Sequence, residues 1–150
     1  MVRTIKYILI SLMLFLVCEP SVLFADSYKS RYDQGRRYFV QGKYNSAIRH
    51  FRNMLETSRT NDLSDNCQYW IGEAYFNMKK YEQALIEFDR TLTFPNTNKR
   101  EDAMYKVANC HEKLGEKKLA REMYLRLLAD YPESRHTSYV LKVLEKLGTS

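Results

Sequence analysis

Apolar residues recur at intervals of three and four along most of the chain, which is the spacing that places them on one face of a helix. Between residues 81 and 92 the apolar positions are Tyr81, Ala84, Leu85, Phe88 and Leu92. The chain has five Gly and three Pro in 150 residues, which is too few for the many turns of a strand-and-turn or loop-dominated protein. The pattern therefore predicts an all-α domain.

Two columns of small residues and one column of rings repeat along the chain at a nearly constant period. The columns are Gly35, Gly72 and Ala108; Ala47, Ala84 and Ala120; and Phe51, Phe88 and Tyr124. Their spacing is 37 and then 36 residues, slightly longer than the ~34 of a tetratricopeptide repeat, and an extended turn between repeats would absorb the difference. The sequence thus predicts three tetratricopeptide helix pairs in a right-handed solenoid, at about 28–61, 65–98 and 101–134.

Each column has an expected role in packing. The two small residues of a repeat would let its helices approach closely where they cross, and the ring would fill the space toward the next repeat. Gly42 and Gly115 are placed to end the first helix of a pair in the left-handed conformation. Lys79 stands at this position in the second repeat, at an expected cost of about 1 kcal/mol.

The boundaries of the last elements follow from capping signals. Asn98 followed by Glu101 indicates a helix start, and Pro132 indicates the stop after the third pair. Beyond it, about residues 134–147 carry apolar residues on one side and Lys or Glu elsewhere. These apolar residues are Val140, Leu141, Val143, Leu144 and Leu147. Because a stack of repeats cannot leave its last apolar face open, this segment is predicted to be a capping helix.

The N-terminal segment is typical of an export signal. Two basic residues precede an uncharged, mainly apolar run of 11 residues at 7–17, which is short of the ~20 needed to span a bilayer. Ala25 supplies the small residue for cleavage, which gives a signal peptide at 1–25 and a repeat domain at 26–150. Cys18 directly follows the run and leaves lipidation as the alternative. Both interpretations predict an exported, periplasmic protein.

Two motifs carry a resemblance to a known family. The second repeat reads YWIGEAYFNMKKYEQALIEFDRTL at 69–92, and the next unit ends in LLADYPES at 127–134. Residues 28–147 resemble the periplasmic tetratricopeptide domain of the Tol–Pal-associated cell division coordinator family (CpoB/YbgF-type). The resemblance implies a non-enzymatic scaffold that links the Tol machinery to peptidoglycan synthesis during constriction. That family has an N-terminal trimerising coiled coil, whereas no heptad segment precedes Tyr28 here, so no oligomeric state is predicted.

The first helices of successive pairs line the concave groove of a tetratricopeptide stack. A ladder of tyrosines recurs there at the repeat period, and tyrosine offers apolar area and a hydroxyl at little entropic cost. The alternative is that these rings pack between neighbouring first helices and only their edges reach solvent. The predicted partner-binding groove comprises Lys29, Tyr32, Arg36, Phe39, Tyr69, Glu73, Phe76, Asn77, Tyr105, Asn109 and Lys113. Because Tyr32 and Arg36 stand where chaperone-binding relatives have Lys and Asn, no carboxylate clamp is predicted.

The net charge of +6 is concentrated in the first repeat. Residues 28–61 hold eight basic and two acidic side chains, whereas the other two repeats are slightly acidic. Export argues against nucleic acid as a partner. The predicted partners are envelope proteins or their acidic peptide segments, with anionic lipid headgroups at the membrane surface or the wall polymer as alternatives. A solvated face that keeps the protein soluble is the other interpretation.

The sequence predicts no enzyme activity, no cofactor and no metal. Cys110, His111 and Glu112 are adjacent, but consecutive helical residues point ~100° apart and do not converge on one ion. Cys67 and Cys110 are expected near opposite ends of adjacent first helices, beyond the ~7 Å that a disulfide tolerates. Two functions remain as alternatives to the division scaffold. One is an assembly or chaperone-type adaptor resembling the outer-membrane assembly lipoproteins, and the other is an accessory to a separately encoded enzyme or transporter.

Overall fold

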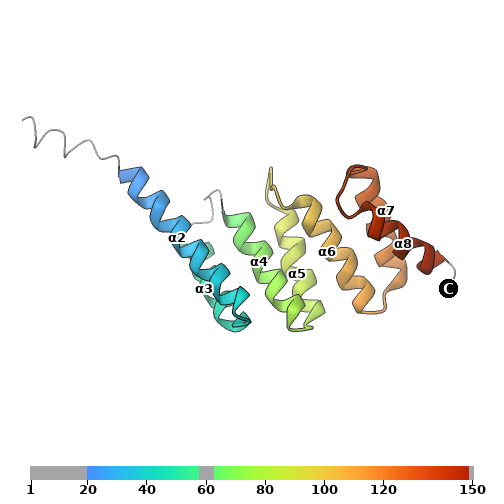
Figure 1. The fold of residues 1–150 in the computed structure, drawn as a ribbon, viewed down its shortest axis with the longest axis horizontal. Coiled ribbons are helices and arrows are strands. Elements are labelled where there is room, and N and C mark those ends of the chain that lie inside the picture. The colour runs from blue at the N-terminus through green and yellow to red at the C-terminus, as the bar shows by residue number, and fades with distance from the viewer. Residues whose placement is uncertain (1–19, 58–62, 149–150) are drawn as a thin grey trace, which may run out of the picture.

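The computed structural model describes residues 20–57 and 63–148, with residues 20–26 as backbone only, and these ranges form successive helices. The helices are α2 (Pro20–Val40), α3 (Tyr44–Thr57), α4 (Ser64–Asn77), α5 (Tyr81–Leu92), α6 (Arg100–Lys113), α7 (Lys117–Asp130) and α8 (Thr137–Gly148). Figure 1 shows them side by side in chain order, from α2 at one end to α8 at the other. Each helix packs against the next, and α2 also contacts α4. The predicted all-α architecture of three helix pairs and a final helix is confirmed.

In the first two pairs, the small residue of the first helix lies directly against the ring of its own repeat. A Cβ on Gly35 would lie 2.6 Å from the ring of Phe51, and one on Gly72 would lie 2.7 Å from the ring of Phe88. The glycines therefore make room for the ring of their own repeat. The rings also reach the next repeat as predicted, because Phe51 shares a core cluster with Ile71 of α4 and Phe88 shares one with Val107 of α6. Both phenylalanines are fully buried.

The turns inside the pairs confirm the role assigned to Gly42, Gly115 and Lys79. All three have positive φ, at 72°, 79° and 59°. In each turn the backbone N–H of the following residue reaches back to a carbonyl five residues earlier, as from Lys80 to Tyr75 at 3.0 Å. This bond closes the end of a helix in a Schellman turn. The second repeat keeps the turn with a lysine in the conformation that glycine adopts more easily.

The predicted start of the third helix pair needs correction. Lys99, not Asn98, precedes α6, and its backbone N–H donates to Oγ1 of Thr97 at 3.0 Å. Glu101 is not a capping side chain, because it accepts a hydrogen bond from Ser134 at 2.6 Å. The stop before Pro132 is confirmed, since α7 ends at Asp130.

At the C-terminal end of the described chain, the last helix starts later than predicted. The last helix begins at Thr137 rather than 134, and it buries Val140 and Val143 while Leu141 remains 54% exposed. At the other end, α2 begins at Pro20, so the backbone at the predicted cleavage point after Ala25 is helical. The leader up to residue 19, with Cys18, lies outside the described residues. Within the described ranges, no helix is both long and apolar enough to cross a membrane.

Candidate partner-binding face

The predicted groove residues lie on α2, α4 and α6, the first helices of the three pairs, and α8 follows them in the stack. We call the surface formed by these helices and the turn before α8 the first-helix face. Its side chains meet in three seams: the first between α2 and α4, the second between α4 and α6, and the third between α6 and the turn at 131–136 with α8. The contacts in these three seams determine which charged and aromatic groups the face exposes.

The predicted tyrosine ladder is largely packed into the protein. Tyr69 is 9% exposed, and its ring centre lies 5.5 Å from that of the buried Phe88. Burial raises the pKa of Tyr69 well above its ordinary value. Tyr32 and Tyr105 are half-buried, and each is held by a neighbour from the adjacent element. Tyr69 is thus buried by packing between helices, whereas Tyr32 and Tyr105 keep part of their rings exposed.

The first seam is organised by Trp70, the only tryptophan of the chain. Its Nε1–H donates to the hydroxyl of Tyr32 at 2.6 Å, and its ring meets that of Phe39 edge-on at 4.9 Å between centres. The guanidinium of Arg36 lies over the indole at 5.2 Å from the ring centre. This contact is a cation–π interaction that leaves the guanidinium exposed. The seam thus presents an aromatic surface with a free cation on top.

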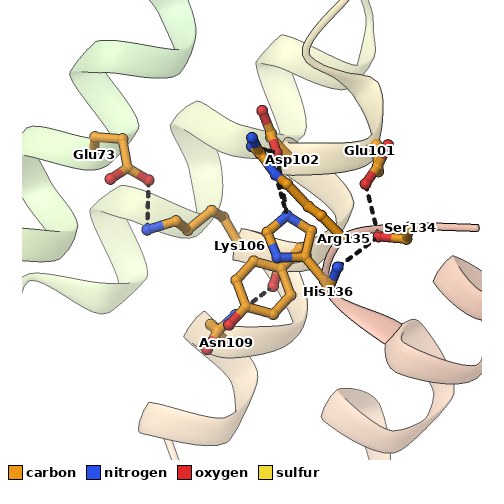
Figure 2. Close-up of polar contacts among 9 residues, drawn as sticks. Glu73, Glu101, Asp102, Lys106, Asn109, Ser134, Arg135 and His136 are labelled. Atoms are coloured by element: carbon orange, nitrogen blue, oxygen red, sulfur yellow. Dashed lines mark hydrogen bonds and ion pairs between the residues drawn. The ribbon is translucent and has the colours of Figure 1, made fainter. Parts of the chain in front are cut away.

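The second seam holds an ion pair. Nζ of Lys106 lies 2.7 Å from Oε1 of Glu73 and 4.7 Å from the ring centre of Phe76. Figure 2 shows Lys106 reaching from α6 toward Glu73 on α4. At the edge of the same seam, Lys99 lies over the ring of Tyr69 at 5.9 Å. The positive charge of Lys106 in the middle of the face is therefore neutralised by the carboxylate of Glu73.

The third seam ties α6 to the cap. The ring of Tyr105 stacks on His136 with centres 3.8 Å apart and planes 7° from parallel. Oδ1 of Asp102 contacts Nε2 of His136 at 3.2 Å and also pairs with Arg135 (Figure 2). Burial alone would raise the pKa of Asp102, but the hydrogen bonds from His136 and Arg135 outweigh it and hold the pKa below its usual range.

The remaining predicted residues divide by exposure. Lys29, Asn77 and Lys113 are exposed, whereas Asn109 is 7% exposed. Both asparagines donate their amide N–H to a carbonyl of their own helix, Asn77 to Glu73 at 2.8 Å and Asn109 to Tyr105 at 2.7 Å. These bonds leave the two amides with less capacity for a partner than the prediction assumed.

Sequence reasoning missed the residues that complete the seams, namely Trp70, Lys106, Asp102 and His136. Trp70 and Lys106 each directly follow a tyrosine of the ladder. Scanning that column would have found them. Asp102 and His136 belong to no repeating column, so the sequence held no equivalent signal for their contact.

The basic charge of the first repeat is mostly uncompensated. Among its described basic residues, Arg52 pairs with a carboxylate, that of Glu87 at 3.2 Å. Arg31 and Arg37 donate instead to neutral amide oxygens of Asn53 and Gln34. No described carboxylate pairs with Lys29 or Arg36. The α2 end of the first-helix face therefore carries free positive charge.

A cavity of about 700 Å³ lies between α3, α4, α5 and the turn at Phe94, and it is lined by none of the predicted groove residues. Its wall contains Glu87, which is 5% exposed and bonds to Gln68, Arg52 and Arg90. Because each of these partners comes from a different helix, the carboxylate joins α3, α4 and α5. Such a satisfied polar network stabilises the packing of helices rather than marking a reactive group.

The titratable groups provide no reactive constellation among the described residues. Cys67 and Cys110 are free and buried, and burial raises the pKa of each thiol to about 12. His111 contacts Glu116 at 2.6 Å through Nδ1 rather than its neighbour Glu112. Over residues 20–57 and 63–148, no three His, Cys, Asp or Glu side chains are grouped as a metal site would require.

Comparison with family profiles gives two matches. A tetratricopeptide repeat profile matches residues 102–134, and a profile described as anaphase-promoting complex, cyclosome, subunit 3 matches residues 14–91, more than half of the chain. The chain belongs to the tetratricopeptide repeat family. No curated protein sequence matches it.

Solved tetratricopeptide structures share the fold. The Yersinia enterocolitica type III secretion chaperone SycD, in complex with a peptide of the translocator YopD, matches with a TM-score of 0.72 and 16% identity, over 83% of this chain and 94% of that one. The second repeat domain of human RPAP3, in complex with an HSP70 peptide, matches with a TM-score of 0.64 and 21% identity, over 79% and 92%. At these identities the likeness shows the fold alone.

Proposed function

We propose that this tetratricopeptide protein is a non-enzymatic scaffold that binds an acidic segment of a partner protein on its first-helix face. The observation that carries the proposal is the free positive charge at the α2 end. Lys29 and Arg36 are exposed and have no carboxylate partner among the described side chains, and Arg36 lies on the aromatic surface of Trp70. Cations beside flat aromatic area suit a segment that has acidic and apolar side chains.

Related structures support a peptide as the ligand. The RPAP3 and SycD domains are each described in complex with a peptide, so this fold is compatible with that mode of binding. The RPAP3 ligand, SGPTIEEVD, is acidic. By the same analogy, the secretion chaperone supports an adaptor for unfolded or outer-membrane clients as the second candidate function.

We place the scaffold in the cell envelope as part of the same proposal. The support is the apolar leader and the resemblance of 69–92 and 127–134 to the Tol–Pal-associated division coordinator. A tagged full-length chain should fractionate with periplasmic proteins and should require the Tol proteins to reach the division site. Retention in the cytoplasm would contradict the envelope role and leave the binding proposal intact.

The binding test compares two arginines of equal charge. Crosslinking in envelope extracts identifies the partner, and its bound segment is then titrated while the emission of Trp70 is followed. Arg36→Glu should weaken binding at least about tenfold and reverse its salt dependence, because the free cation is replaced by a repelling charge. Arg49→Glu, on α3 and exposed, makes the same change away from the face and should bind as the parent does. Equal loss in both variants would show that net charge, and not this face, determines binding.

A further inference from the structure

In the middle of the first-helix face, the ammonium group of Lys106 is already paired with a carboxylate of the protein, that of Glu73. Lys106 is 20% exposed and Glu73 is 12% exposed, so their contact at 2.7 Å is largely shielded from water. The ring of Phe76 covers the ammonium group from another side at 4.7 Å. Figure 2 shows the two side chains bridging α4 and α6. A ligand that reaches this seam meets an ion pair and not a free charge.

The cations elsewhere on the face differ in this respect. Lys29 and Arg36 at the α2 end have no described carboxylate partner. Lys99 and Lys113 flank α6 at its two ends, roughly two helical turns from Lys106 and so at the edges of the face. In the third seam, Asp102 pairs with Arg135 and also contacts His136. Positive charge open to a ligand is therefore concentrated at the α2 end.

We propose that Glu73 acts as a built-in competitor for Lys106, so that the face selects segments with their acidic residues at one end and an uncharged middle. The inference rests on the proposed function and specifies the ligand of the same face. A ligand carboxylate that enters the second seam must displace Glu73 from Lys106. Glu73 would then be left partly buried without a cation, which is strongly unfavourable. At the α2 end a ligand carboxylate displaces no carboxylate that the structure describes.

The ion pair also joins two neighbouring repeats, and a purely structural role would be expected to change stability alone. Selectivity between ligands separates the two roles. A structural role predicts that all ligands are affected alike when Glu73 is neutralised. A competitor role predicts that only ligands with centrally placed acidic residues gain affinity.

The test uses synthetic peptides of one composition, labelled with fluorescein and measured by anisotropy at low salt. One group has its glutamates at the amino or the carboxyl terminus, and the other has them in the centre. The parent should bind one of the terminal peptides at least about fivefold more tightly than the central peptide. Glu73→Gln should bind the central peptide about fivefold more tightly than the parent does, because a charge-assisted hydrogen bond to Lys106 becomes available. Affinity for the terminal peptides should stay unchanged.

Two controls sharpen the result. Glu82→Gln changes the net charge equally at an exposed position of α5, and it should leave every affinity at the parent value. Glu73→Gln combined with Lys106→Gln removes the released cation, and the gain for the central peptide should vanish. Circular dichroism confirms that each variant is folded. If Glu73→Gln melts early, Lys106→Gln alone gives the answer, because the unpaired Glu73 should then weaken the central peptide and spare the terminal ones.

The outcomes separate this inference from the function on which it rests. Equal binding of terminal and central peptides by the parent, or an equal gain for both in Glu73→Gln, overturns the competitor role while the acidic-segment face stands. If the parent binds none of the acidic peptides and Arg36→Glu changes nothing, the proposed function fails and the competitor role fails with it.

Discussion

Gly72→Ala is the sharpest test of how the helix pairs are packed. The added Cβ would lie 2.7 Å from Cδ1 and Cε1 of Phe88 and 3.1 Å from its Cζ. Carbon atoms in contact prefer about 3.5–4.0 Å, so the ring would have to move by nearly an ångström. Phe88 is fully buried and already contacts the ring of Tyr69, which leaves it no open direction. The substitution therefore adds a methyl group where there is no room.

The expected size of the effect comes from two opposing contributions. Overpacking a buried site costs about 1–3 kcal/mol. Alanine is more favourable than glycine in a helix by about 1 kcal/mol, which offsets part of this cost. Because the methyl group would lie only 2.7 Å from a fully buried ring, the overpacking cost should lie in the upper part of this range, at about 2–3 kcal/mol. The free energy of unfolding should therefore fall by about 1–2 kcal/mol, and the Tm of this domain by about 3–8 °C.

Thermal unfolding followed by circular dichroism measures the change, and Gly148→Ala is the matched control. A Cβ at Gly148 meets no atom within 4 Å, so this variant should keep the parent Tm. In a Phe88→Leu background, itself less stable, Gly72→Ala should cost less, because the ring that obstructs the methyl group is gone. A Tm at or above the parent value for Gly72→Ala in the unaltered background would refute the argument that the glycine is required for close packing.

The two thiols, the third seam and the cap each give a measurable expectation. Because burial raises the pKa of Cys67 and Cys110 to about 12, Ellman's reagent should label neither in the folded protein at mildly alkaline pH, and rapid labelling would contradict their burial. Asp102→Asn should lower the free energy of unfolding at neutral pH by about 1–2 kcal/mol. Since the folded pKa of Asp102 is depressed, this stabilisation should be lost as the pH falls from about 4 through the folded pKa, and a difference that does not depend on pH would refute the ion pair. Deleting residues 137–148 should cause aggregation or earlier melting, whereas an equally stable monomer would show that α8 is not a cap.

The architecture was predictable because its determinants repeat. The columns through Gly72, Ala84 and Phe88 occur three times at one period, and a helix pair needs those residue types wherever it crosses. The turn at Gly42 was predictable for a similar reason, since a left-handed residue is needed to end the helix. Lys79 shows that the conformation is dictated by the turn, because the backbone adopts φ 59° there even without a glycine.

The helix boundaries were less predictable because they depend on tertiary contacts. Asn98 and Glu101 have the spacing of a local cap, yet Glu101 bonds to Ser134, 33 residues away. Thr97 has its own long-range partner, donating its hydroxyl to Asp65 at 2.7 Å while accepting from Lys99. A local signal fails where a distant side chain offers a better partner.

The helices that hold the candidate site residues were predicted from the sequence, but the contacts between these residues were not, and the reason is geometric. The seam contacts join unlike positions of neighbouring repeats: Trp70 bonds to Tyr32, 38 residues before it, and Lys106 pairs with Glu73 on the preceding first helix. Both contacts arise from the position directly after the tyrosine ladder, which holds Asp33, Trp70 and Lys106 in the three repeats. A position that faces the preceding first helix does not lie where the two helices of a pair cross. It therefore does not need a small residue or a ring, and its residue type can vary. The columns that repeat determine how the helices stack, and this non-repeating column determines what each seam offers to a ligand.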